Sequence, residues 1–228
     1  MITITDFGTE INKEILVKAN DVVNYFYVAT HDNNIKRKII LQANAHVTIC
    51  SAVLAGHNQQ EIVIEHVGAG ATSNHYGLFF GKEHDHYLMN YWSNHMASNT
   101  TGHIKIHGVL LDAAYADVKG DIKIQPTGKQ TSASLVEAVL LLGDKARAET
   151  IPQLEIATNN VQASHSSAIT TIDEEQLFYL QSRGLALAEA RRMIMMGFLA
   201  EILQEFNNND MQKQIINFIK NKLSPPTP

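Results

Sequence analysis

Hydrophobic and polar residues alternate along much of the chain from about residue 11 to residue 161, a pattern typical of β-strands that bury one face. In Glu61–Glu65, Ile62 and Ile64 point one way and the glutamates point the other. The segments Gly102–Ile106 and Gly120–Ile124 repeat this alternation, each with two isoleucines, and start 18 residues apart. Short strands that repeat between polar turns predict the coils of a β-solenoid, although spacing alone leaves a β-sandwich open.

The spacing of apolar residues becomes helical after Ile172. Asp173 is the predicted N-cap of a first helix, with Gln176 reaching back to it in a capping box, and Gly184 lies where that helix should end. Two further stripes recur at helical spacing, namely Ala190, Met193, Ile194, Gly197, Phe198 and Ile202, and then Met211, Ile215, Ile216, Ile219 and Leu223. Asn209 is a predicted cap for the last of them.

These patterns divide the chain into three parts. We predict a β core over residues 1–171, a helical subdomain over residues 172–223 and a disordered tail over residues 224–228, where prolines prevent a helix.

Composition narrows the class of protein. The chain has 228 residues, of which 45% are hydrophobic, and no apolar run approaches the roughly 20 residues of a membrane span. The first residues show no secretory signal, and the single cysteine, Cys50, excludes an internal disulfide and fits a reducing compartment. A net charge of −5 argues against a nucleic-acid partner. We therefore expect a cytoplasmic protein that binds neither membrane nor nucleic acid.

The segment from residue 152 to residue 191 carries the most specific pattern in the chain. It holds, in order, PQLEI (Pro152–Ile156), VQASH (Val161–His165), LFYLQSRG (Leu177–Gly184) and EAR (Glu189–Arg191). This ordered string resembles the SufB/SufD family, the scaffold proteins of the SUF iron–sulfur cluster assembly machinery, and is closer to SufD. The strong match covers about residues 138–203, and a looser match extends back to about residue 70.

The resemblance implies a mainly β fold, a right-handed parallel β-helix with a C-terminal α-helical appendage. It implies that the β-helix pairs with a SufB-like subunit or a second copy of the chain, and that the helices dock a SufC-type ABC ATPase. The chain itself would be a non-catalytic scaffold subunit. The docking candidates on the helices are Leu177, Phe178, Tyr179, Arg183, Arg191 and Phe198.

His165 is the candidate residue for cluster assembly or metal binding, because it matches a histidine of the family. Its position on the face of Val161 and Ala163 leaves a hydrogen-bonded core histidine as the competing interpretation. The chain departs from the family here, since SufD members often carry cysteine where Ala163 stands. With Cys50 as its only thiol, the chain alone should hold no stable all-cysteine cluster, so we expect a transient cluster in the complex.

The remaining cysteine, histidine and aspartate residues give weaker indications of function. Cys50 fits a buried structural cysteine, and the remaining histidines fit solvated strand faces. Asp112, Asp117 and Asp121 leave a carbohydrate-active β-helix enzyme open as an alternative function. A minimal homodimeric cluster scaffold is the other alternative.

Overall fold

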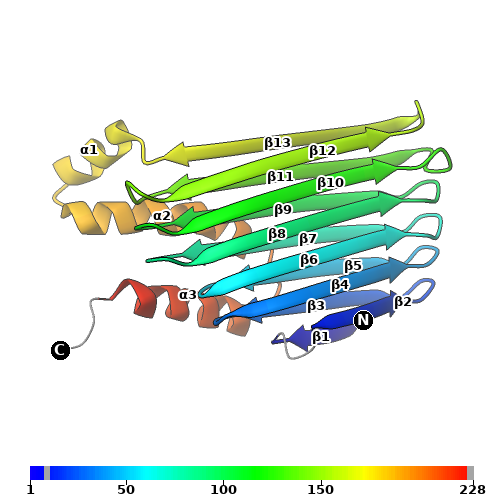
Figure 1. The fold of residues 1–228 in the computed structure, drawn as a ribbon, viewed down its shortest axis with the longest axis horizontal. Coiled ribbons are helices and arrows are strands. Elements are labelled where there is room, and N and C mark those ends of the chain that lie inside the picture. Colours follow the sequence, from blue (N-terminus) through cyan, green and yellow to red (C-terminus); the bar gives the residue numbers. More distant parts are fainter. Residues whose placement is uncertain (8–10, 225–228) are drawn as a thin grey trace.

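The computed structural model describes residues 1–7 and 11–224. Within these residues the chain runs through a series of strands and then three helices (Figure 1). The strands are β1 (Ile2–Asp6), β2 (Asn12–Val17), β3 (Val22–Ala29), β4 (Asn33–Leu41), β5 (His46–Val53), β6 (His57–His66), β7 (Thr72–Gly81), β8 (His86–His95), β9 (Thr101–Leu110), β10 (Tyr115–Ile124), β11 (Thr131–Leu141), β12 (Arg147–Ile156) and β13 (Val161–Thr171).

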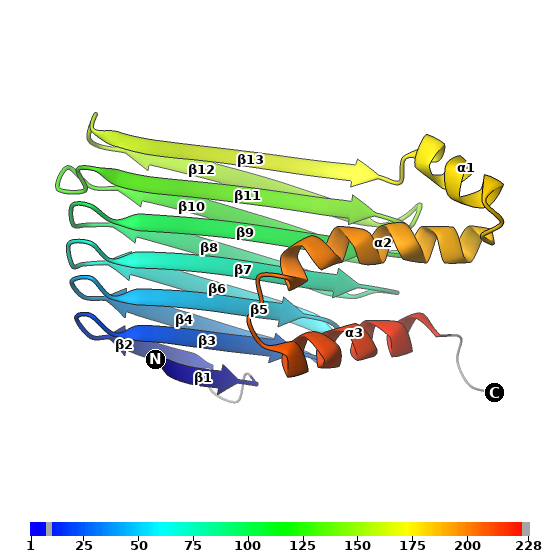
Figure 2. The ribbon, with the colours of Figure 1, turned by 180° about the vertical axis from the view of Figure 1, so that it is seen from behind.

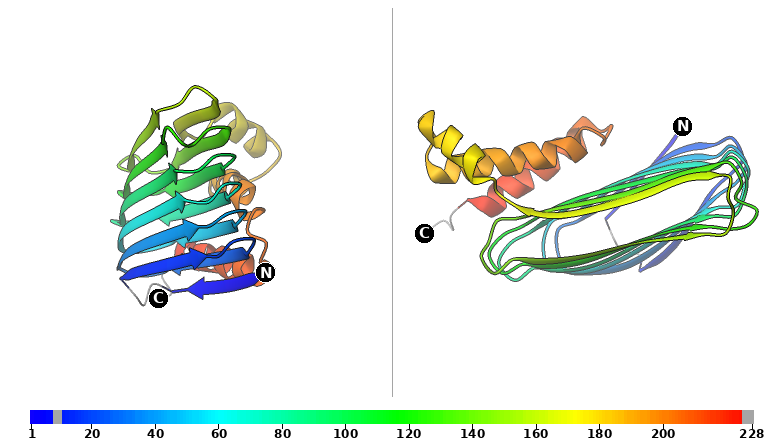
Figure 3. Two further views of the ribbon diagram at one scale, coloured as in Figure 1. Left: turned by 90° about the vertical axis from the view of Figure 1, so that its right-hand side faces the viewer. Right: turned by 90° about the horizontal axis from the view of Figure 1, so that it is seen from above.

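Successive strands alternate between two sheets, and neighbouring strands within each described sheet are parallel. The odd-numbered strands form a seven-stranded sheet in the order β1-β3-β5-β7-β9-β11-β13, and the even-numbered strands form a six-stranded sheet. Seen along the stack, the coils enclose a flattened interior between the sheets (Figure 3). The predicted parallel β-helix with a C-terminal helical appendage is confirmed.

The register corrects one detail of the predicted repeat. Gly102 belongs to β9 and Gly120 to β10, so the two similar segments lie in opposite sheets of one coil. The equivalent position in the next coil is Ala133, which pairs with Gly102 and lies 31 residues later. The alternation of both strands is the same because each buries one face against the same interior.

Three histidines that we expected on solvated strand faces are enclosed in this interior. His66, His75 and His95 are fully buried, since their positions in the alternation face inward. His66 is hydrogen-bonded to Ser73 at 2.9 Å, and the rings of His66 and His95 stack with centroids 4.1 Å apart. Small hydroxyl residues on neighbouring strands thus satisfy imidazoles that burial would otherwise penalise.

The three helices follow the last strand. They are α1 (Glu174–Ser182), α2 (Leu187–Leu203) and α3 (Asn209–Leu223). Asp173 is the N-cap of α1, as predicted, but its carboxylate accepts from the Glu175 backbone N–H in place of a capping box with Gln176. The cap of α3 is Asn208, one residue before the predicted Asn209. Gly184 follows α1 with a φ of 93°, a conformation that favours glycine at a helix end.

Helices α2 and α3 pack on the outer face of the odd-numbered sheet (Figure 2). This contact forms a second apolar core, separate from the β-helix interior, in which Phe26, Cys50 and Phe80 meet Leu199 and Phe206. No helix among residues 1–7 and 11–224 is long and apolar enough to cross a membrane. Of the predicted tail, only Ser224 falls within the described residues.

Candidate functional sites at the open end and on the helices

The C-terminal end of the β-helix is open. Strands β12 and β13 are the last strands of their sheets, with 10 and 11 residues, so each presents one long unpaired backbone edge. Their inward apolar side chains lack a covering coil, and Ile156 and Ile169 are 43% and 44% exposed. At the opposite end β1 and β2 are short, with 5 and 6 residues.

His165 lies in the middle of this open end. It pairs in register with the buried Leu135 of β11, which places its side chain in line with the inward residues of the coil below. Val161 and Ala163, on the same face, pack partly against the core. His165 itself is exposed because no further coil covers it. The structure therefore places this histidine at the surface of the open end and not within an enclosed core.

Glu137, one coil below, is a residue that the sequence analysis missed. It lies on β11 with 1% of its surface exposed, and neither carboxylate oxygen has a hydrogen-bond partner among the described residues. The carboxylate reaches across the interior toward β10, where a Cβ atom on Gly120 would lie 2.8 Å from Oε1. Burial raises the pKa of Glu137 to about 7, since removal from water disfavours the charged carboxylate.

The last coil forms a thin cover over Glu137. Ser167 of β13 pairs in register with Glu137, and Pro152 of β12 pairs with Gly120. The hydroxyl of Ser167 is hydrogen-bonded to that of Thr150, which joins the two sheets at this level. One layer of small polar side chains thus separates the buried carboxylate from the open end.

The described part of the chain contains no cluster of cysteine or histidine side chains that forms a metal site. No group of three or more His, Cys, Asp or Glu side chains gathers there in a metal-binding arrangement. Cys50 is buried beneath the helices, beside the Glu205 carbonyl, and burial raises the pKa of its thiol to about 12. Cys50 is therefore a buried structural cysteine with little thiolate at neutral pH.

The helices α1 and α2 form an apolar groove. Its volume is about 550 Å³, and its lining includes Tyr179, Leu180, Met193 and Phe198. Met193 is 51% exposed and Tyr179 56% exposed. This surface is unusual, because large apolar side chains at a helix pair normally face the core.

The six docking candidates do not all face this groove or the solvent. Phe178 is 74% exposed, whereas Leu177 is buried at 5%. Arg183 lies over the Tyr179 ring at 5.2 Å and donates to its hydroxyl, and Arg191 is exposed. Phe198 is half-buried and stacks on His107.

Comparison with models of protein families shows which family this chain belongs to. The model described as "SUF system FeS cluster assembly, SufBD core domain" matches residues 6–198, which is most of the chain. The chain belongs to the SufBD family.

Curated relatives agree with this membership. The chain is 34% identical over 129 residues to the iron–sulfur cluster assembly protein SufD of Bacillus subtilis, which covers 57% of this chain and 30% of the relative. It is 30% identical over 209 residues to a SufBD family protein of Mycobacterium tuberculosis, covering 88% of this chain and 51% of the relative. The chain thus spans about half the length or less of these relatives.

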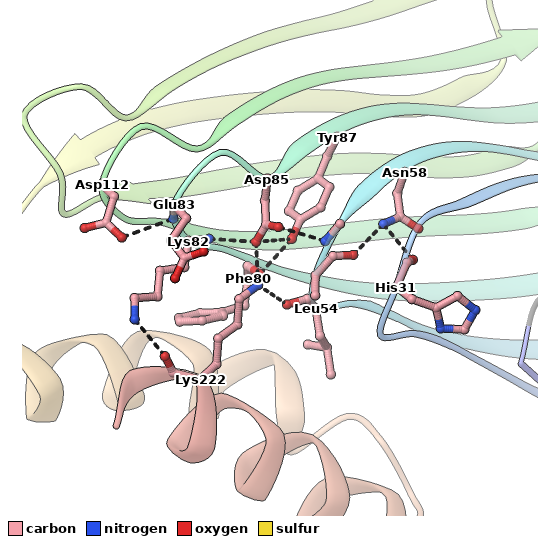
Figure 4. Close-up of polar contacts among 12 residues, drawn as sticks. His31, Leu54, Asn58, Phe80, Lys82, Glu83, Asp85, Tyr87, Asp112 and Lys222 are labelled. Atoms are coloured by element: carbon pink, nitrogen blue, oxygen red, sulfur yellow. Dashed lines mark hydrogen bonds and ion pairs between the residues drawn. The ribbon is translucent and has the colours of Figure 1, made fainter. Parts of the chain in front are cut away.

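An ion pair fixes the last helix of this SufBD chain to the β-helix turns (Figure 4). Lys222 of α3 donates to the Asp85 carboxylate and, at 2.6 Å, to the Leu54 carbonyl. Asp85 also accepts from the backbone N–H groups of Gly56 and Lys82, at 2.7 and 2.8 Å. The side chain of Lys82 returns a bond of 2.9 Å to the Lys222 carbonyl. The end of α3 is therefore tied to two turns of the stack.

The aspartates considered for a glycosidase do not form a catalytic pair. Asp112 lies in a turn, whereas Asp117 and Asp121 lie on the outer face of β10. Four residues of strand separate these last two backbones by about 13 Å, beyond the carboxylate separation of about 5–10 Å that glycoside hydrolysis uses. Asp117 is moreover paired with Lys119 at 2.9 Å.

Proposed function

We propose that this chain is a SufD-like scaffold subunit that pairs through the open end of its β-helix and docks a SufC-type ABC ATPase on its helices. The observation that carries the proposal is the exposed His165 at an open solenoid end, in a chain that belongs to the SufBD family. The chain contributes binding surfaces and catalyses no separate reaction. An iron–sulfur cluster would be its transient cargo in the complex.

The open end supports pairing with a SufB-like subunit or with a second copy. Long unpaired edges at β12 and β13, together with half-exposed Ile156 and Ile169, are features that another chain can cover. The other end suits this role less well, because a buried ion pair between Asp6 and Arg37, at 2.9 Å, fills the first coil. His165 would then lie at the junction between the paired subunits.

The groove between α1 and α2 supports ATPase docking. Tyr179 and Met193 line the groove with exposed apolar surface, Phe178 adds exposed apolar surface on α1, and Arg183 and Arg191 are exposed positive charges on the same helical segment. Only Ile172 and Asp173 separate β13 from α1, so a force on the helices acts directly on the strand that carries His165. Nucleotide-driven movement of the ATPase would in this way rearrange the paired end.

Copurification tests the docking. The purified chain should bind its cognate SufC-type ATPase at micromolar concentrations, and Phe178→Ser or Met193→Ser should weaken that binding at least about tenfold. Leu88→Ser is the matched control, since Leu88 is an exposed apolar residue on the opposite sheet. An ATPase that binds none of these proteins, or all of them equally, contradicts the proposal.

The molar mass in solution tests the pairing. If the chain forms a dimer and Ile169→Asp dissociates it, the result favours the homodimeric scaffold. If the chain is a monomer and forms a heterodimer with a SufB-like chain, the result favours the SufD role. Leu16→Asp, a change of the same kind near the other end, should leave the mass unchanged. A chain that stays monomeric alone and with a SufB-like chain contradicts pairing.

A further inference from the structure

Glu137 is the one buried side chain whose polar atoms all lack partners among the described residues. Other buried polar side chains with an unpaired atom, such as His75 and Gln60, keep a second atom in a hydrogen bond. A buried carboxylate without donors costs several kcal/mol if it is charged, so an apolar residue would stabilise this coil better. A carboxylate at this position is therefore better explained by a ligand that it binds than by a contribution to the stability of the coil.

The register brings Glu137 close to His165. His165 pairs with Leu135, two residues before Glu137 on the neighbouring strand, and both side chains face the interior. With strands about 4.8 Å apart and a rise of about 3.3 Å per residue, the two Cα atoms lie about 8 Å apart. A glutamate and a histidine at this separation can share one metal ion, whose bonds are about 2 Å long.

The carboxylate of Glu137 and the imidazole of His165 indicate which class of ligand would bind. A carboxylate without hydrogen-bond donors gains most from a cation, and imidazole adds a nitrogen ligand. Carboxylate and imidazole together suit ferrous iron and similar divalent transition metals. The hydroxyls of Thr150 and Ser167, which bond to one another just above Glu137, provide a polar entrance.

We propose that Glu137 and His165 together bind a divalent transition-metal ion, which enters through the open end of the β-helix. This proposal rests on the proposed function, because it assigns the iron-binding groups of the end that would pair. Water or the paired subunit supplies the remaining ligands, since the described chain gathers fewer than three.

Titration of the full chain with Co²⁺, followed by its visible absorption, tests the proposal without any cluster assembly assay. Anaerobic calorimetry with Fe²⁺ repeats the measurement with the expected metal. Glu137→Gln keeps the shape of the side chain, and His165→Asn alters an exposed residue, so thermal melting should show both variants folded. The controls are Glu149→Gln on the outer face of β12 and His57→Asn on the outer face of β6.

We expect one metal ion per chain or per pair, with Glu137→Gln and His165→Asn each weakening binding at least about tenfold. Wild-type binding that equals that of Glu137→Gln, or an equal loss in the two controls, overturns the proposal. If Glu137→Gln fails to fold, the His165→Asn result decides. Metal binding without ATPase binding would contradict the docking alone, and ATPase binding without metal binding would contradict this inference alone.

Discussion

Removing the carboxylate of Asp85 should loosen α3 more than removing the ammonium group of Lys222, although the two form one ion pair. In Asp85→Ala, the backbone N–H groups of Gly56 and Lys82 lose their acceptor, and the ammonium group of Lys222 keeps only the Leu54 carbonyl. Breaking a largely buried pair in this way costs about 3–5 kcal/mol.

In Lys222→Met the loss is smaller. Asp85 keeps three other donors, and the methionine side chain keeps contact with Phe80, over whose ring the ammonium group lies at 5.7 Å. Burial lowers the pKa of Lys222 and Asp85 raises it, so part of the ion-pair energy already offsets desolvation. We expect a loss of about 1–2 kcal/mol.

Hydrogen exchange of the α3 amides measures both losses, because a helix at the edge of a fold opens locally. Exchange should accelerate by about two orders of magnitude or more in Asp85→Ala and by about one in Lys222→Met. The double variant should lose less than the sum of the single variants, since it contains no unpaired ammonium group. Equal acceleration in the single variants, or additive losses, would refute this reasoning.

Three further predictions follow from burial. Burial lowers the pKa of His66 to about 4 and that of His95 to about 2, so the unfolded chain binds more protons than the folded chain, and the free energy of unfolding should fall as the pH drops below about 6.5. Urea unfolding of His66→Gln should show a shallower fall with pH than the wild type. An equal pH dependence in the two proteins would count against a neutral, buried His66. In the same assay, Leu199→Ala in the buried core should lower the free energy of unfolding by about 2–5 kcal/mol, and Met193→Ala on the surface should lower it by less than about 1 kcal/mol. Equal losses in the two variants would contradict this prediction. Cys50 should react with iodoacetamide only after denaturation, as mass spectrometry can show, and rapid labelling of the native chain would be inconsistent with its burial.

Much of the fold could be predicted because strand alternation records which side chains face inward. Ile62, Ile64, Ile104 and Ile122 are all buried as their alternation indicates. The coil length could not be obtained this way, since strands of opposite sheets share one period and sequence distance does not reveal which strands pair. The helix limits were close, because caps such as Asp173 act locally.

The candidate site was only partly predictable. Alternation does place Glu137 inward between Leu135 and Val139, and that position was a usable indication of a buried carboxylate. Its isolation depends on Gly120 across the interior, a contact between residues that sequence spacing does not relate. The exposure of His165 likewise depends on β13 being the last strand of its sheet, because the same inward position in any earlier coil is covered.

The interior of the β-helix shows why Glu137 differs from the other polar residues there. His66, His75 and His95 each have a hydroxyl partner on a nearby residue, and these hydrogen bonds within a closed stack offset the cost of burying the imidazoles. Glu137 has no such partner, and it lies in the last coil but one, where a cation or a second subunit can still reach it. The polar groups deep in the stack thus complete the fold, whereas the carboxylate beneath Ser167 requires, in our proposal, a group that arrives from outside.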